Sequence, residues 1–264
     1  MQYVSEEFGK FPINKELCAF YKSMICSLDV SETTKEMLSA PFLMQASPGY
    51  VNNPDKSVFI VGQESHGWGG KSIGFSYSSF LKEINREQIM MENQTDFVMD
   101  RYERNASKGK PLWEAIRNII QISNDHEMPG QPYLWANLMA SDYNGGSFIK
   151  KLSTKDECTF IEFSKKKFIG EISILKPKIC VLLTGPDYDF VVENFFNLPS
   201  DWEKTDIRSL KECSDPSIND LIYVKTFEWN GCRFFRTYHP RHLRLKNMWH
   251  IVDVISQTVK NILR

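Results

Sequence analysis

The residues best suited to chemistry follow a short apolar run at 58–61, where the chain turns abruptly polar. Gln63, Glu64, Ser65 and His66 place an amide, a carboxylate, a hydroxyl and an imidazole next to one another. A carboxylate can orient water, and an imidazole can donate or accept a proton. Ligands of open α/β sheets bind at the carboxyl ends of the strands, so these groups predict a catalytic or binding site.

Two further polar clusters follow apolar runs. One lies after the run at 133–139, which contains Asn137, and the other spans 238–243, with His239 and Arg241. Parallel strands bring their carboxyl ends to one edge of a sheet. We therefore expect Glu64, Asn137 and His239 to face one pocket.

The elements that must position these residues alternate along the chain. Apolar runs predict strands at 58–61, 133–139 and 179–184, and a hairpin at 222–229 and 232–238 around Asn230-Gly231. Helical spacing and start signals predict helices at 14–28, 31–38, 77–104, 112–122, 155–175, 187–196 and 247–263. Strands alternating with helices predict an α/β fold, a three-layer α/β/α sandwich with a mainly parallel central sheet.

The composition is that of an ordinary globular protein. The chain has 264 residues, of which 42% are hydrophobic and 25% charged, and we expect a single domain over 1–264. No signal segment or membrane-length apolar run is visible, and the six cysteines are scattered without a C-x-x-C pair. We expect a cytoplasmic monomer with reduced cysteines, no membrane partner, no metal and no cofactor.

The carboxyl-terminal end is basic although the net charge of the whole chain is −1. Residues 231–264 carry seven Lys and Arg and one Asp, a net charge of +6. Such an end can face phosphates, or it can be a solvated helix surface.

Five segments, in order, resemble motifs of the uracil-DNA glycosylase superfamily. Residues 62–64, Gly-Gln-Glu, resemble its water-activating G-Q-D motif, and 239–243, His-Pro-Arg-His-Leu, resemble its H-P-S-x-L motif. Between them, 74–76 resembles the base-stacking segment, 134–138 the strand with the base-reading asparagine, and 174–185 a helix, lysine-proline, strand, glycine passage. The resemblance spans 58–245; it leaves out the first 50 residues and a helical insert at about 85–110.

The resemblance implies a monofunctional DNA glycosylase that extracts a base from the stack and hydrolyses its N-glycosidic bond. It implies that Glu64 activates water and that His239 stabilises the departing base. It implies DNA as the partner. The residues implied to contact the substrate base are Gln63, His66, Trp68, Phe75 and Asn137. Those implied to contact phosphates are Arg241, Arg244 and Lys246, and Leu243 is implied to be a wedge in the DNA. For Leu243, packing of the last helix is an equal alternative.

One departure from the family bears on the substrate. Uracil-selective members carry a tyrosine after G-Q-D that excludes C5 substituents, whereas this chain has Gly67, Trp68, Gly69 and Gly70 there. If Trp68 refills the space of the tyrosine, we expect the base to be uracil; otherwise we expect a bulkier C5-modified pyrimidine such as some viruses use. DNA repair and antiviral defence are both open as roles.

Two other functions compete with excision. A relative that binds nucleic acid without cleaving it would be expected to lose Glu64, Asn137 or His239, all of which are present. A serine hydrolase using Ser65 and His239 would often place an acid three residues before the histidine, where this chain has Arg236.

Overall fold

The structure, a computed structural model, describes residues 9–64, 76–103, 110–123, 133–199, 202 and 224–264. Contacts concentrate in two compact units whose segments alternate along the chain. Unit 1 consists of Met1–Ala46, Gly62–Phe97 and Ala136–Leu175, and unit 2 of Ser47–Val61, Val98–Trp135 and Lys176–Arg264. Within the described ranges, no helix has both the length and the hydropathy needed to cross a membrane. The single domain over 1–264 stays a prediction.

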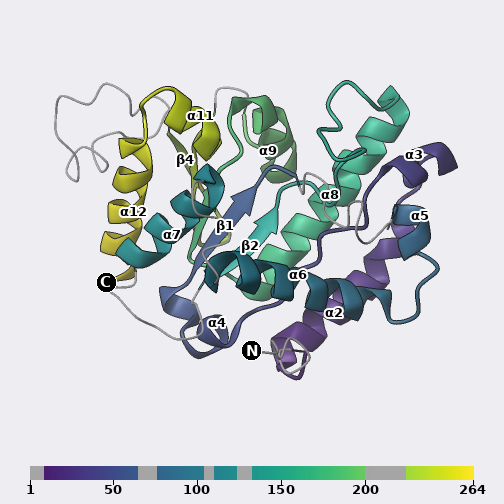
Figure 1. The fold of residues 1–264 in the computed structure, drawn as a ribbon, viewed down its shortest axis with the longest axis horizontal. Helices are drawn as coiled ribbons and strands as arrows, with labels where there is room; N and C mark the ends of the chain where they lie inside the picture. The colour runs from purple at the N-terminus through teal and green to yellow at the C-terminus, as the bar shows by residue number, and fades with distance from the viewer. Residues whose placement is uncertain (1–8, 65–75, 104–109, 124–132, 200–201, 203–223) are drawn as a thin grey trace. The chain divides into compact units, whose positions relative to one another are not determined.

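Among the described residues, five strands form one mixed, mostly parallel sheet in the order β2-β1-β3-β5-β4, so the predicted α/β class is confirmed (Figure 1). The strands are β1 (Val58–Gly62), β2 (Tyr133–Asn137), β3 (Ile179–Leu182), β4 (Lys225–Trp229) and β5 (Cys232–Arg236). β1, β3 and β5 are parallel neighbours, and β4 pairs antiparallel with β5. Asn230 and Gly231 join β4 to β5 with φ of 47° and 76°, the double positive φ that a two-residue hairpin turn requires.

The helices of unit 1 are α2 (Pro12–Met24), α3 (Glu32–Met37), α5 (Tyr77–Phe80), α8 (Thr154–Leu175) and most of α6 (Arg86–Glu103), together with the 3-10 turn η1 (Ile25–Ser27). Those of unit 2 are α4 (Pro48–Asn52), α7 (Pro111–Ser123), α9 (Asp189–Phe196), α11 (Pro240–Leu245) and α12 (His250–Leu263), with the 3-10 turns η2 (Pro54–Lys56) and η3 (Pro186–Tyr188). The sequence predicts a helical stretch at 77–104 with a break near Asn93. The break lies earlier, at a turn where Asn85 has φ of 55°, and it divides the stretch into α5 and α6.

In unit 2, the inner strands of the sheet are largely buried on both faces, whereas the edge strand β4 is partly exposed. Phe234 and Phe235 are successive residues of β5, so their side chains point to opposite faces, and neither is exposed. On one face, Phe234 stacks on Phe227 of β4 at 4.5 Å and packs against Phe196 of α9 at 4.8 Å. α7 and α12 pack on each other, which Figure 1 draws as a crossing pair.

In unit 1, α2 packs closely on α8. A Cβ at Gly170 would lie 2.1 Å from the ring of Phe20, so the absence of a side chain allows this contact. Beside it lies a fully buried polar network: the Tyr21 hydroxyl donates to Glu171 at 2.7 Å, and Lys167 pairs with the same carboxylate at 2.8 Å. Burial raises the pKa of Glu171, although Lys167 and Tyr21 act in the opposite direction. The network ties the two helices together at the cost of burying two charges.

Candidate functional site

The first group of predicted site residues lies in unit 1, just past the carboxyl ends of β1 and β2. The Leu138 amide donates to the Gly62 carbonyl at 2.9 Å, and the Met139 amide donates to the Gln63 carbonyl at 3.1 Å. From the first bond to the second, the residue number rises by one in both segments. The two segments therefore leave the sheet side by side and parallel. This pairing places the segment that carries Glu64 next to the segment that begins at Asn137.

Glu64 is a buried carboxylate with only 5% of its surface exposed. Its Oε1 accepts a hydrogen bond from the Ser147 hydroxyl at 3.1 Å and a longer one from the Phe148 amide at 3.4 Å. Two donors on one oxygen restrict the rotation of the carboxylate. A carboxylate held in this way can orient a water molecule.

A tight turn brings Ser147 back to Glu64. Asn144 and Gly145 have φ of 51° and 74°, and the Tyr143 and Gly146 backbones bond to each other across the turn at 2.9 and 3.1 Å. Asp142 reinforces the turn by accepting from the Gly145 amide at 2.8 Å. We did not predict a role for Ser147. The Asn-Gly pair at 144–145 is a turn signal in the sequence, and it indicates that the next residues fold back.

Asn137, the last residue of β2, is 1% exposed. Its side-chain nitrogen Nδ2 has no hydrogen-bond partner among the described residues. A buried donor without an acceptor destabilises the folded state by about 1–3 kcal/mol. An acceptor on a bound molecule would remove that penalty.

The second group lies in unit 2, after β5. His239 is the N-cap of α11: its Nδ1 accepts from the Arg241 amide at 3.3 Å, and its carbonyl accepts from the His242 amide at 2.8 Å. Pro240 occupies the first position of the helix, where a missing N–H costs nothing. Because Nδ1 is an acceptor, a neutral His239 carries its proton on Nε2, which is then a donor.

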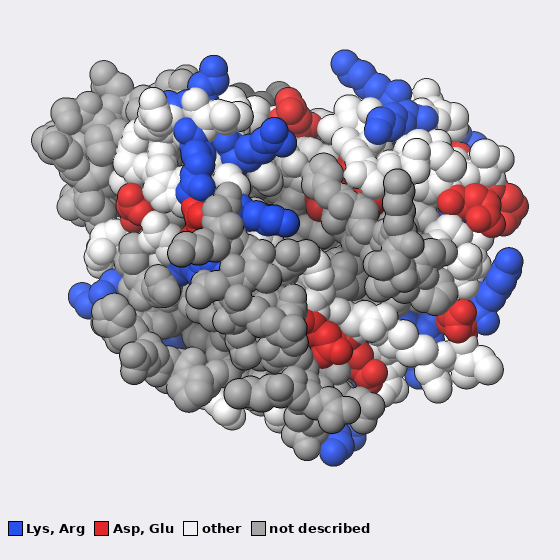
Figure 2. All heavy atoms as spheres, viewed as in Figure 1, with Lys and Arg blue, Asp and Glu red and all other residues white. Residues whose placement is uncertain are grey.

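α11 presents a basic surface. Arg241, Arg244 and Lys246 are exposed, and Figure 2 shows blue side chains gathered over this helix. Arg244 pairs with Glu114 of α7 and lies 4.5 Å from the ring centre of Trp249, so part of its charge is already neutralised. Leu245 is 73% exposed among these cations, an apolar side chain for which the sequence predicts no role.

Leu243 does not fit the role of a wedge. Its side chain is fully buried, because it lies on the inward face of α11. A wedge must be free to enter the base stack. The assignment is corrected in favour of the alternative interpretation, packing inside unit 2.

Arg236, three residues before His239, is also a packing residue. It is 3% exposed and pairs with Asp189 at the start of α9, which Lys225 also contacts at 3.0 Å. Burial lowers the pKa of the Arg236 guanidinium, and Asp189 opposes this effect. Position 236 therefore holds a buried arginine paired with Asp189, and not an acid that could orient His239 in a serine hydrolase.

Ser65, His66, Trp68 and Phe75 lie outside the described residues. In the part of the chain that the structure describes, no group of three or more His, Cys, Asp or Glu is placed to hold a metal ion. No protein-family model matches the chain, and no curated protein matches it.

Proposed function

We propose that this protein is a monofunctional DNA glycosylase that hydrolyses the N-glycosidic bond of a flipped, non-standard pyrimidine. The observation that carries the proposal is the buried amide of Asn137, whose Nδ2 lacks a partner among the described residues beside the segment leading to Glu64. Pyrimidine carbonyls offer the acceptor that this donor needs. The proposal includes the finer fold, a three-layer sandwich of the uracil-DNA glycosylase type.

Glu64 is the proposed catalytic carboxylate. When the bond between C1′ and the base nitrogen breaks, both electrons leave with the base and the sugar becomes cationic. A fixed carboxylate stabilises that cation and accepts a proton from the water that attacks C1′. The hydrogen bond from Ser147 supports this role because it holds the carboxylate in one orientation.

His239 is the proposed donor to the leaving base. Charge accumulates on a base carbonyl oxygen as the bond breaks, and an Nε2–H group can stabilise it. The N-cap bond from Arg241 supports the required tautomer, because it occupies Nδ1 as an acceptor. His239 follows β5, a strand of the parallel set.

The basic surface of α11 is the proposed DNA contact. Arg241 and Lys246 are exposed and would bind phosphates, and Arg244 would contribute less because Glu114 already pairs with it. Leu245 takes the place of Leu243 as the apolar side chain that could enter the base stack. In this proposal the protein acts on DNA in the cytoplasm as a monomer, in repair or in antiviral defence.

The proposed substrate is uracil or a pyrimidine enlarged at C5, and we favour the enlarged base. Uracil and thymine differ only by the C5 methyl, and an apolar pocket without a rigid wall discriminates one methyl by only about 1–3 kcal/mol. The family's tyrosine wall is missing from 65–70. An enzyme that needs a bulky C5 group would spare thymine in ordinary DNA.

The deciding experiment uses the full chain and oligonucleotides that contain uracil, thymine, 5-hydroxymethylcytosine or its glucosylated form. Alkali-labile abasic sites and the released base are measured, with Glu64→Gln as the matched control. We expect excision of a C5-enlarged pyrimidine faster than of uracil, and strongly slowed excision of both by the control variant. Release of uracil alone would refute the enlarged pocket, and binding without any release would support the non-cleaving alternative.

A further inference from the structure

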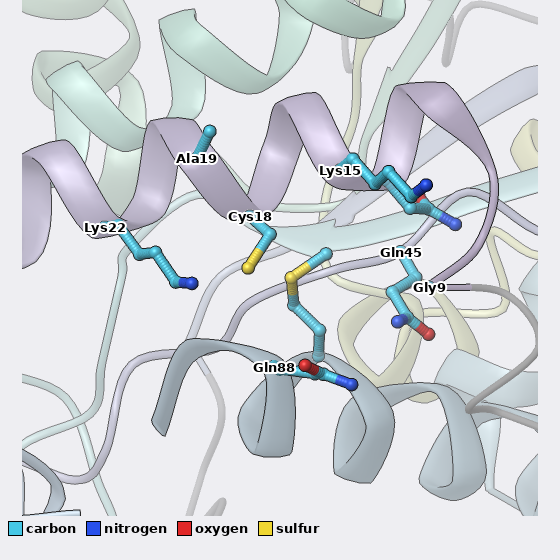
Figure 3. A pocket seen from close by; sticks show the side chains of 9 residues that line it. Gly9, Lys15, Cys18, Ala19, Lys22, Gln45 and Gln88 are labelled. Atoms are coloured by element: carbon cyan, nitrogen blue, oxygen red, sulfur yellow. The ribbon is translucent and has the colours of Figure 1, made fainter. Parts of the chain in front are cut away.

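A cavity of about 330 Å³ lies in unit 1 between α2 and α6 (Figure 3). Its volume is at the lower end of the range for small-molecule sites, roughly 300–1,000 Å³. None of its lining residues belongs to the proposed glycosylase site. The cavity is therefore distinct from that site.

Gln45 provides the observation that points to a ligand. The residue is only 7% exposed, and its Oε1 accepts from the Thr95 hydroxyl at 2.7 Å. Its Nε2 is buried without a partner among the described residues, and Figure 3 shows the amide turned toward the gap between the two helices. Buried amide donors are nearly always paired, so an acceptor is missing here.

The cavity also offers positive charge. Lys15, Cys18 and Lys22 are spaced three and four residues apart on α2, so they share one face of the helix. Figure 3 shows Lys15 and Gln45 toward one end of the cavity, Lys22 toward the other, and the Cys18 thiol between them. A molecule spanning the cavity would thus meet a cation at each end.

Acidic groups on α6 only partly offset this charge. Arg86 pairs with Glu87 at 3.0 Å and balances its charge, whereas Glu92 keeps its negative charge while it accepts a hydrogen bond from the Gln88 amide at 2.8 Å. Burial raises the pKa of Cys18; Lys22 acts in the opposite direction, and Glu87 and Glu92 raise the pKa further. The thiol is therefore protonated at neutral pH, and the cavity lacks an activated thiolate for covalent chemistry.

We propose that this cavity binds a small organic anion with an acid group at each end. One acid group accepts a hydrogen bond from Gln45 and pairs with Lys15, and the other pairs with Lys22. The carbon skeleton between them packs on Met91, which is buried on α6. The proposal does not depend on glycosylase activity.

The test measures alkylation of Cys18 by iodoacetamide, followed by peptide mass spectrometry, with the exposed Cys158 as an internal reference. The probes are glutarate, 3-phosphoglycerate and uncharged glutaramide, which matches glutarate in size. We expect at least one of the two anions to slow the reaction of Cys18 roughly tenfold near saturation, because protection follows the bound fraction. The Cys158 rate should not change, and glutaramide should have no effect. The glutarate and 3-phosphoglycerate arms distinguish carboxylate from phosphate ligands.

Substitutions test whether the protection of Cys18 arises from binding in this cavity. Gln45→Met and the double variant Lys15→Gln/Lys22→Gln should each abolish the protection, whereas Lys166→Gln, at an exposed site on α8, should keep it. Thermal unfolding of each variant checks that it folds. Equal protection by glutaramide, no protection by either anion, or protection that persists in the folded double variant would overturn the proposal.

Discussion

The Ser147 hydroxyl donates a hydrogen bond to Oε1 of Glu64 at 3.1 Å, across 83 positions of the sequence. This bond orients the carboxylate that the proposed mechanism uses. Glu64→Gln should leave DNA binding nearly unchanged and lower the single-turnover rate strongly, since an amide cannot accept the proton of water. Ser147→Ala should lower the rate roughly tenfold, the effect of losing about one hydrogen bond. Ser173→Ala, at an exposed position of α8, is the control.

Substitutions of His239 can separate its two roles. His239→Ala should lower the single-turnover rate on the order of a hundredfold, the effect of losing one donor to developing charge, and should also lose the N-cap. His239→Asn keeps a side chain that can cap α11 but lacks the Nε2 donor. We expect equal rate loss in both variants and a lower melting temperature only for alanine. Full activity of the asparagine variant would remove His239 from the mechanism.

Asn137 should show a conflict between stability and function. Asn137→Leu has a similar volume and removes the buried Nδ2, so we expect an unchanged or higher free energy of unfolding in urea. The same variant should lose base selectivity and most of its activity. A clear loss of stability would mean that the amide already has a structural partner.

The basic residues of α11 should contribute unequally to DNA binding. Arg241→Ala and Lys246→Ala should each weaken binding to all sequences similarly and reduce the salt slope by about one. Arg244→Ala should change the slope less, because Glu114 already pairs with Arg244. Fluorescence anisotropy over a salt series measures the slopes, with the exposed Lys56→Ala as control. If all variants kept the salt slope of the parental protein, the basic residues of α11 would be a solvated surface that does not contact DNA.

The buried pair of α8 should govern stability. Glu171→Gln leaves the Lys167 ammonium buried without its counter-charge, so we expect a loss of about 3–5 kcal/mol in the free energy of unfolding. Lys167→Met/Glu171→Gln removes both charges and keeps an acceptor for Tyr21. Urea unfolding should show that the double variant is more stable than the single one. The opposite order would show that the ion pair itself stabilises the protein.

Local chemistry made much of the fold predictable. Continuous apolar runs indicated β1 and β3, and helical patterns indicated α8 and α12. Asn230-Gly231 indicated the β4–β5 hairpin, because a turn with two positive φ angles favours these residues. The sequence also placed Glu64 and Asn137 directly at strand ends. These features depend on neighbouring residues alone, which is why they can be recognised without a structure.

The tertiary structure decided which side chains are free to act. Leu243 and Leu245 are both leucines of one short helix, yet one is fully buried and the other 73% exposed. Arg236 and Arg244 count as basic residues in the sequence, but Asp189 and Glu114 pair with them. Ser147 reaches Glu64 only because the chain folds back at 144–145. Burial and long-range pairing arise from elements distant in sequence, and no local pattern of residue types encodes them.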